Sequence, residues 1–210
     1  MSDDGRRLYV ADGAADRILV VPVAGGGATY TLRGTAGSAP RGLEIQALEG
    51  RSFVVYTGRV HGKPALLRIA AAGAPKPTVL LEGAPPRAPD GVAISKTGAI
   101  YVSDHSDPSG GRALRIAGGQ VTTVADHILL GHPGGTALTL DESKLLISSL
   151  KRGAGTARVL IVDTVSGATS TFDDVISANR GAGGLHRARA AVSFGGAGVT
   201  RTGRVYRVDP

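Results

Sequence analysis

The fold is decided by residues 89–116, whose sequence is PDGVAISKTGAIYVSDHSDPSGGRALRI. This stretch contains runs of apolar, β-branched or alternating residues at 90–94, 100–104 and 112–116, and a further run follows at 120–124. Gly, Pro, Asp or Ser residues bound these runs, and short bounded runs of this kind predict antiparallel strands. No segment of the chain shows a helical period over about ten residues. The stretch therefore predicts a sheet of four short strands.

The same pattern of four runs recurs along the chain. Its third run begins at Arg112, Arg158 and Arg204, so the repeat length is 46 residues in both steps. Four short strands in a repeat of about 40–50 residues are typical of a β-propeller blade, whereas the rival fold, a right-handed β-helix, has shorter rungs. We therefore predict an all-β protein, a β-propeller of four-stranded blades. We expect a single domain over residues 1–210, with repeats at approximately 1–39, 40–87, 88–131, 132–179 and 180–210.

The set of predicted strands is incomplete at both ends of the sequence. Counted from the propeller axis outward, the repeats supply four first strands, five second, five third and four outermost strands. The first repeat lacks its first strand, and the last repeat lacks its outermost strand. We hypothesise that the chain carries about five blades of a truncated six-bladed propeller. Because open blade edges present unpaired backbone groups, we also expect self-association through them.

The basic excess of the chain is diffuse. The sequence has 24 Lys and Arg against 17 Asp and Glu, a formal net charge of +7, and the basic residues are spread throughout. A surface that binds nucleic acid needs clustered cations with interleaved aromatic side chains. The whole chain has only 5 Tyr and 3 Phe. We therefore expect a solvated arginine-rich surface and no specific nucleic acid binding.

Several classes of protein are excluded by what the sequence lacks. The absence of cysteine excludes a disulfide framework, a thiolate metal site and a cysteine nucleophile. No apolar run approaches about 18 residues, which excludes a membrane-spanning helix. A Gly-x-Ser-x-Gly elbow and a phosphate-binding Gly-x-x-x-x-Gly-Lys loop are also missing. Met1 is followed by polar residues, so this chain carries no signal peptide and its compartment stays open, including an exported or periplasmic one.

Three stretches resemble a known family. These are DGRRLYVADGAADRILVVPV at 4–23, PDGVAISKTGAIYVSD at 89–104 and GRVYRVDP at 203–210. They resemble the six-bladed β-propellers of the gluconolactonase/senescence-marker-protein class (SGL) and the related NHL-repeat proteins. The resemblance covers essentially the whole chain. Its motifs are specific for the architecture and weak for the activity, because function lies in sites placed on a fold.

The resemblance implies a divalent cation, Ca²⁺, Mg²⁺ or Mn²⁺, in the central channel, which activates water or polarises a lactone carbonyl. The family's ligands are a Glu from the first blade, two Asn and an Asp. Asp90 matches the Asp and becomes a candidate metal ligand or catalytic base. Where the family has one Asn this chain has Pro133, Gly134 and Gly135, and its single Asn is Asn179.

Other polar residues are candidates for a site at the channel mouth. His132 and His186 lie at or within first strands, and His105 follows a second strand beside Asp104. With Asp90 and Glu44 they could converge on the axis as a ligand-binding site. Arg41 occupies the position of Asp90 one repeat earlier, so the two could form an ion pair. The alternative is that these side chains cap turns or face solvent.

Two functions stay open from the sequence. The first is a non-enzymatic propeller that binds a small molecule or a protein at the channel mouth. The second is a divalent-metal-dependent lactonase or esterase-type hydrolase that uses Asp90. The missing Asn ligands favour the first function.

Overall fold

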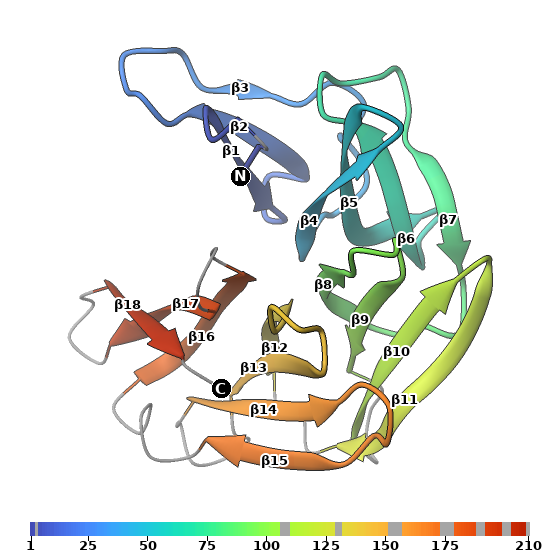
Figure 1. Ribbon diagram of the computed structural model, residues 1–210. Coiled ribbons are helices and arrows are strands. Elements are labelled where there is room, and N and C mark those ends of the chain that lie inside the picture. Colours follow the sequence, from blue (N-terminus) through green and yellow to red (C-terminus); the bar gives the residue numbers. More distant parts are fainter. Residues whose placement is uncertain are drawn as a thin grey trace. The chain divides into compact units, whose positions relative to one another are not determined.

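The computed structural model describes residues 1–2, 4–105, 110–128, 132–150, 157–172, 179–187, 192–198 and 203–208. It divides into two compact units, Met1–Pro89 and Asp90–Pro210. The regular structure of the described residues consists entirely of strands (Figure 1). The described part of the chain contains no helix with the length and hydropathy needed to cross a bilayer. The prediction of an all-β protein is confirmed.

The first unit contains two antiparallel sheets in which consecutive strands are neighbours. The first sheet has three strands, β1 (Arg7–Asp12), β2 (Arg17–Pro22) and β3 (Tyr30–Thr31). The second sheet has four strands, β4 (Leu43–Leu48), β5 (Arg51–Val60), β6 (Lys63–Ala70) and β7 (Thr78–Glu82).

The second unit contains three further sheets with the same consecutive order. The third sheet comprises β8 (Pro89–Ile94), β9 (Ile100–Asp104), β10 (Gly111–Ala117) and β11 (Gln120–Ile128). The fourth sheet comprises β12 (His132–Leu138), β13 (Lys144–Leu150), β14 (Ala157–Asp163) and β15 (Thr169–Phe172). The fifth sheet comprises β16 (Asn179–Arg187), β17 (Val192–Gly198) and β18 (Gly203–Val208).

The strands match the predicted repeat. Among the described residues, three sheets have four strands, and the first and fifth sheets have three. The first sheet starts at the strand that the sequence assigned as second in its repeat, and the fifth ends at the third strand of its repeat. The prediction of repeated four-stranded sheets is confirmed.

Side chains that alternate along β2 form the core of the first unit. Ile18 and Val20 are fully buried, whereas Leu19 between them is half-buried, because successive residues of a strand point to opposite faces. The buried face packs with side chains of the second sheet. Tyr9 adds a polar link, since its hydroxyl donates a hydrogen bond of 3.1 Å to the carbonyl oxygen of Ala71. Burial raises the pKa of Tyr9, so the phenol stays a neutral donor.

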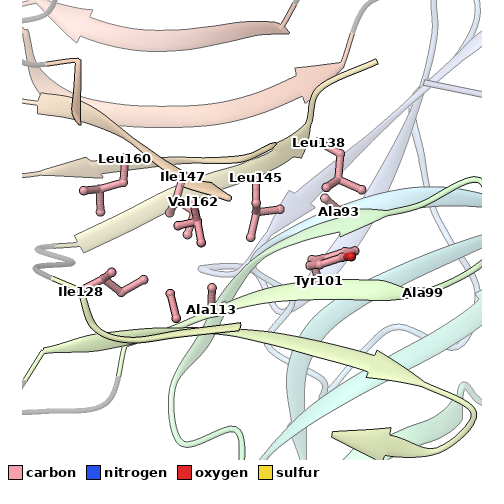
Figure 2. Packing of buried hydrophobic residues seen from close by; sticks show 11 residues of the cluster. Ala93, Ala99, Tyr101, Ala113, Ile128, Leu138, Leu145, Ile147, Leu160 and Val162 are labelled. Atoms are coloured by element: carbon pink, nitrogen blue, oxygen red, sulfur yellow. The ribbon is translucent and has the colours of Figure 1, made fainter. Parts of the chain in front are cut away.

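Small residues of the third sheet face large residues of the fourth sheet in the second unit (Figure 2). Ala93 and Ala113 lie in the same cluster as Leu145 and Ile147, and both of these larger side chains are 0% exposed. Pairing small with large side chains lets two sheets interlock without voids. This packing explains why the repeats are rich in Ala, Val and Leu.

Gly91 has a packing role that the sequence did not show. Gly91 lies within β8, in agreement with the predicted strand run at 90–94. A Cβ atom at this position would lie 2.0 Å from the hydroxyl oxygen of Thr136, closer than atoms can approach. Glycine is therefore required at this position, because β12 lies so close to β8.

The turn between β12 and β13 is held by a carboxylate. Asp141 accepts hydrogen bonds from the Thr139 hydroxyl at 2.6 Å, the Ser143 hydroxyl at 2.8 Å and the Ser143 backbone N–H at 3.1 Å. These donors lower the pKa of Asp141 to about 2. The neighbouring Glu142 accepts a hydrogen bond of 2.7 Å from the backbone N–H of Lys96, which ties the turn to the third sheet.

We expect Leu145→Ala to lower the free energy of unfolding by about 3 kcal/mol, because it removes a fully buried side chain and leaves a cavity. Urea denaturation followed by circular dichroism measures this change. Val165→Ala is the matched control: Val165 is 95% exposed, so its truncation should change the free energy by less than about 0.5 kcal/mol. Equal effects of the two substitutions would contradict the proposed packing of the third and fourth sheets.

Candidate functional site

Arg41 is held at the entrance to β4 by the end of β5. Its backbone N–H donates to the carbonyl oxygen of Thr57 at 3.0 Å. The backbone N–H of Gly42 donates to the Thr57 hydroxyl at 3.0 Å, and the Thr57 N–H donates to the Gly42 carbonyl oxygen at 2.9 Å. Because Thr57 is 0% exposed, this set of hydrogen bonds fixes the backbone from which the Arg41 side chain extends.

The loop before Arg41 is also pressed against β5. The backbone N–H of Arg59 donates to the Ser38 carbonyl oxygen at 2.7 Å. A Cβ atom on Gly58 would lie 2.3 Å from that same oxygen, so only glycine permits the contact. Thr35 anchors the other side of the loop, because its buried hydroxyl accepts a hydrogen bond of 3.1 Å from the backbone N–H of Ile18. The loop is therefore fastened to both sheets of the first unit.

These contacts build a small pocket at the end of β5. Its volume is about 30 Å³, and its described lining residues are Ala39, Arg41, Gly58, Arg59, Pro64, Arg87, Ala88 and Pro89. We call it the arginine pocket. The guanidinium of Arg59 donates to the carbonyl oxygen of Gly62 at 2.9 Å, which orients that side chain. Three of the described lining residues are arginines, so guanidinium groups with several N–H donors each surround the pocket.

A larger, open hollow lies at the opposite end of β5. It has a volume of about 450 Å³, and Tyr9, Arg51 and Ser52 contribute to its lining together with Asp4 and Arg7. Arg51 is the first residue of β5, and Arg59 is close to its end. The two openings are therefore separated by about 27 Å, from eight residues at about 3.4 Å each.

The predicted site residues fall in both units. Arg41 and Glu44 belong to the first unit, and Asp90 and His105 belong to the second. Glu44 is half-buried in β4, and its carboxylate accepts a hydrogen bond of 2.9 Å from the adjacent Ile45 N–H. Arg41 lines the arginine pocket, whereas Glu44 does not. The proposed ion pair of Arg41 with Asp90, and the convergence of this set on an axis, remain predictions.

The other candidates lie in or beside strands of the second unit. Asp90 is half-buried in β8, and His105 is half-buried directly after β9. The backbones of His132 in β12 and His186 in β16 are described, and their side chains lie outside the described part of the structure. Ligand binding by these four residues therefore also stays a prediction.

Asp104, at the end of β9, forms an ion pair that the sequence analysis missed. Its carboxylate accepts a hydrogen bond of 2.8 Å from the guanidinium of Arg112, the residue opposite it on β10. The Asp104 side chain is 0% exposed, and that of Arg112 is 21% exposed. The first sheet has the same arrangement, since Arg17 donates to Asp12 across the β1–β2 pair at 3.1 Å. Both sheets have an Asp at the end of one strand and an Arg at the start of the next. This recurring pattern in the sequence could have predicted the ion pair.

Neutral hydroxyl groups join the inner strands next to Asp90. The Ser103 hydroxyl oxygen accepts a hydrogen bond of 2.9 Å from the Gly91 N–H and another of 3.1 Å from the Thr136 hydroxyl. Ser103 and Thr136 are 0% and 1% exposed. Uncharged donors and acceptors therefore connect β8, β9 and β12 at this position.

The described residues do not fit the divalent cation that the family resemblance implies. Among them, no group of three or more His, Asp or Glu side chains is close enough to hold a metal ion. A hard cation requires several oxygen ligands, and the buried carboxylate nearest in sequence to His105, that of Asp104, is bound by Arg112. In the sequence, Gly134 stands where the family's Pro-Asn-Gly supplies an Asn, and glycine has no side chain to coordinate. We derive no chemistry through a metal from these residues.

Several solved structures have a similar arrangement of strands. A protein described as "putative TolB from Agrobacterium tumefaciens" matches 99% of this chain and 74% of its own chain, with a TM-score of 0.72 and 15% identity. A "putative gluconolactonase" matches 96% of this chain and 73% of its own, with a TM-score of 0.58 and 15% identity. An exo-1,5-α-L-arabinanase from a bovine ruminal metagenomic library matches 100% of this chain and 91% of its own, with a TM-score of 0.58 and 10% identity.

The chain has the β-propeller fold. At these identities the likeness concerns the fold alone. No family model and no curated protein matches the sequence. The β-propeller prediction is confirmed, and the function has to be argued from the residues of the site.

We expect Asp104→Ala to lower the free energy of unfolding by about 3 kcal/mol, because it leaves the Arg112 guanidinium in a largely buried position without its counter-charge. Urea denaturation measures the change. The double substitution Asp104→Ala with Arg112→Met should recover part of the loss. Asp12→Ala is the control, because its pair with Arg17 is more exposed and contributes less than about 1 kcal/mol. A loss at Asp104 no larger than at Asp12 would show that the buried pair is not a structural element.

Proposed function

We propose that this protein is a non-enzymatic propeller of the gluconolactonase-like or NHL type that binds a small molecule or a protein at the loop ends of its sheets. The observation that carries the proposal is the pairing of the buried Asp104 carboxylate with Arg112 at 2.8 Å. A metal-dependent hydrolase needs carboxylates that point their oxygens at a cation. Here this carboxylate serves an ion pair, and hydroxyl groups occupy the neighbouring inner positions.

The arginine pocket supports the same conclusion from the first unit. Arg41, Arg59 and Arg87 line an opening at loop ends, which are the places where β-propellers commonly carry their sites. Positive side chains repel a divalent cation and attract an anionic group. The likeness to a "putative gluconolactonase" supports the β-propeller fold on which this proposal rests. The alternative is a divalent-metal-dependent lactone or ester hydrolase with Asp90 as ligand or base.

We further propose that this propeller is of the six-bladed type. The motif resemblance to six-bladed proteins supports this number.

We expect isothermal titration with Ca²⁺, Mn²⁺ and Zn²⁺ to show no binding at micromolar concentrations, and we expect no lactone hydrolysis above the uncatalysed rate. The reason is that the described residues offer no cluster of three ligands. Asp90→Ala should leave both results unchanged. Metal-dependent lactone hydrolysis by the wild type that disappears in Asp90→Ala would establish the alternative function and overturn this proposal.

Self-association through an open edge is a second part of the proposal. Within the described residues β1 pairs only with β2, and Leu8 and Val10 on β1 are 44% and 38% exposed. An edge strand with exposed apolar side chains accepts a further strand readily. We expect concentration-dependent dimers in light scattering and a shift toward monomer with Val10→Lys, because a charge on an edge strand opposes pairing. Val165→Lys is the charge-matched control in a turn, and an equal shift with this variant would contradict edge pairing.

A further inference from the structure

We infer that the arginine pocket binds a carboxylate group of an anionic small molecule, an inference that rests on the proposed ligand-binding function and names its ligand class. The three arginines come from separate segments of the first unit: Arg41 precedes β4, Arg59 lies near the end of β5 and Arg87 lies between β7 and β8. The fold alone brings them to one opening.

The pocket is large enough for one chemical group of a ligand but too small for a whole ligand molecule. One water molecule needs about 10–15 Å³ of free volume in a cavity. The arginine pocket has about 30 Å³, which is room for about two waters. A carboxylate group has this size, whereas a sugar ring or a nucleobase is larger. The ligand therefore places one carboxylate in the pocket and keeps its body outside.

The chemistry of guanidinium groups suits this ligand. Arginine stays charged at all physiological pH values, and its planar group offers five N–H donors in a fork that matches the two carboxylate oxygens. An arginine that already makes a contact within the fold keeps further donors for a ligand. Arg59 illustrates this, because the donor it gives to Gly62 is one of five.

The backbone behind the pocket is fixed before any ligand arrives. Arg41 and Arg59 are both bound through their backbone N–H groups, to Thr57 and Ser38 respectively. Gly58, which precedes Arg59 on β5, permits the close contact of the loop with the strand. Because little backbone order must be gained on binding, the affinity loses little to conformational entropy.

Other anionic partners fit the pocket less well. Nucleic acid recognition needs aromatic side chains that stack on bases, and the described lining contains none. A phosphate group also pairs with arginine, but its tetrahedral set of oxygens needs more space than a planar carboxylate. The small volume therefore favours a carboxylate.

The test is isothermal titration of the whole chain with citrate at low ionic strength. We expect Arg59→Gln and Arg87→Gln each to weaken citrate binding about tenfold, the change expected from the loss of a charged hydrogen bond. Arg59→Lys should restore part of the affinity. Raising the salt concentration should weaken binding in the wild type, because the three side chains are exposed. Circular dichroism spectra confirm that each variant remains folded.

Arg51→Gln is the matched control. It removes the same charge from the same strand, at the end that lines the larger hollow. Equal weakening by Arg51→Gln and Arg59→Gln would overturn the inference, because citrate would then respond only to net charge. Inorganic phosphate and a hexaglutamate peptide are the comparison ligands. Binding of phosphate without citrate, binding of the peptide alone, or binding of none of the three would also overturn the inference.

The failure of this inference is distinguishable from the failure of the proposed function. Without citrate binding the protein can still bind a different ligand at its loop ends, and the proposed function stands. The proposed function fails only through metal-dependent hydrolysis that requires Asp90, which the arginine substitutions do not affect.

Discussion

The structure depends on the close approach of neighbouring backbones at positions where only glycine fits. At Gly91 the strand β8 lies against Thr136 of β12, and at Gly58 the end of β5 lies against the Ser38 carbonyl. A side chain at either position would force strand and neighbour apart. Because the sheets are this close, small residues such as Ala93 and Ala113 can fill one side of the core while leucine and isoleucine fill the other (Figure 2). The same approach fixes the loops on which the candidate site residues stand.

Tight packing at the strand ends leaves little freedom for buried polar groups. A buried hydroxyl or carboxylate without a partner costs free energy, so such groups must find partners within the fold. Ser103 and Thr136 do so with each other, and Asp104 does so with Arg112. The buried polar residues at these strand ends therefore stabilise the fold by bonding to one another. This explains why a carboxylate at a position typical of a metal ligand can instead be engaged in an ion pair within the fold.

The strands were predictable because each depends on local pattern, namely short β-branched runs between turn residues and a 46-residue repeat. The arginine pocket was only partly predictable. Arg41 was found through its place in Pro40-Arg41-Gly42, but Arg59 and Arg87 belong to no motif and meet Arg41 only through folding. The need for glycine at position 91 could not be predicted, because the contact that requires it comes from Thr136 in another sheet. The Asp104–Arg112 pair could have been found from its recurrence at Asp12 and Arg17.

Stability and the proposed ligand recognition depend on different arginines. Arg112 is largely buried, and removing its charge would leave Asp104 buried without a partner, which is why this pair is committed to the fold. The arginines of the pocket lie at exposed loop ends, where a charge costs little to keep and contributes little to folding. Charge at these ends can therefore vary in sequence while the sheets stay intact.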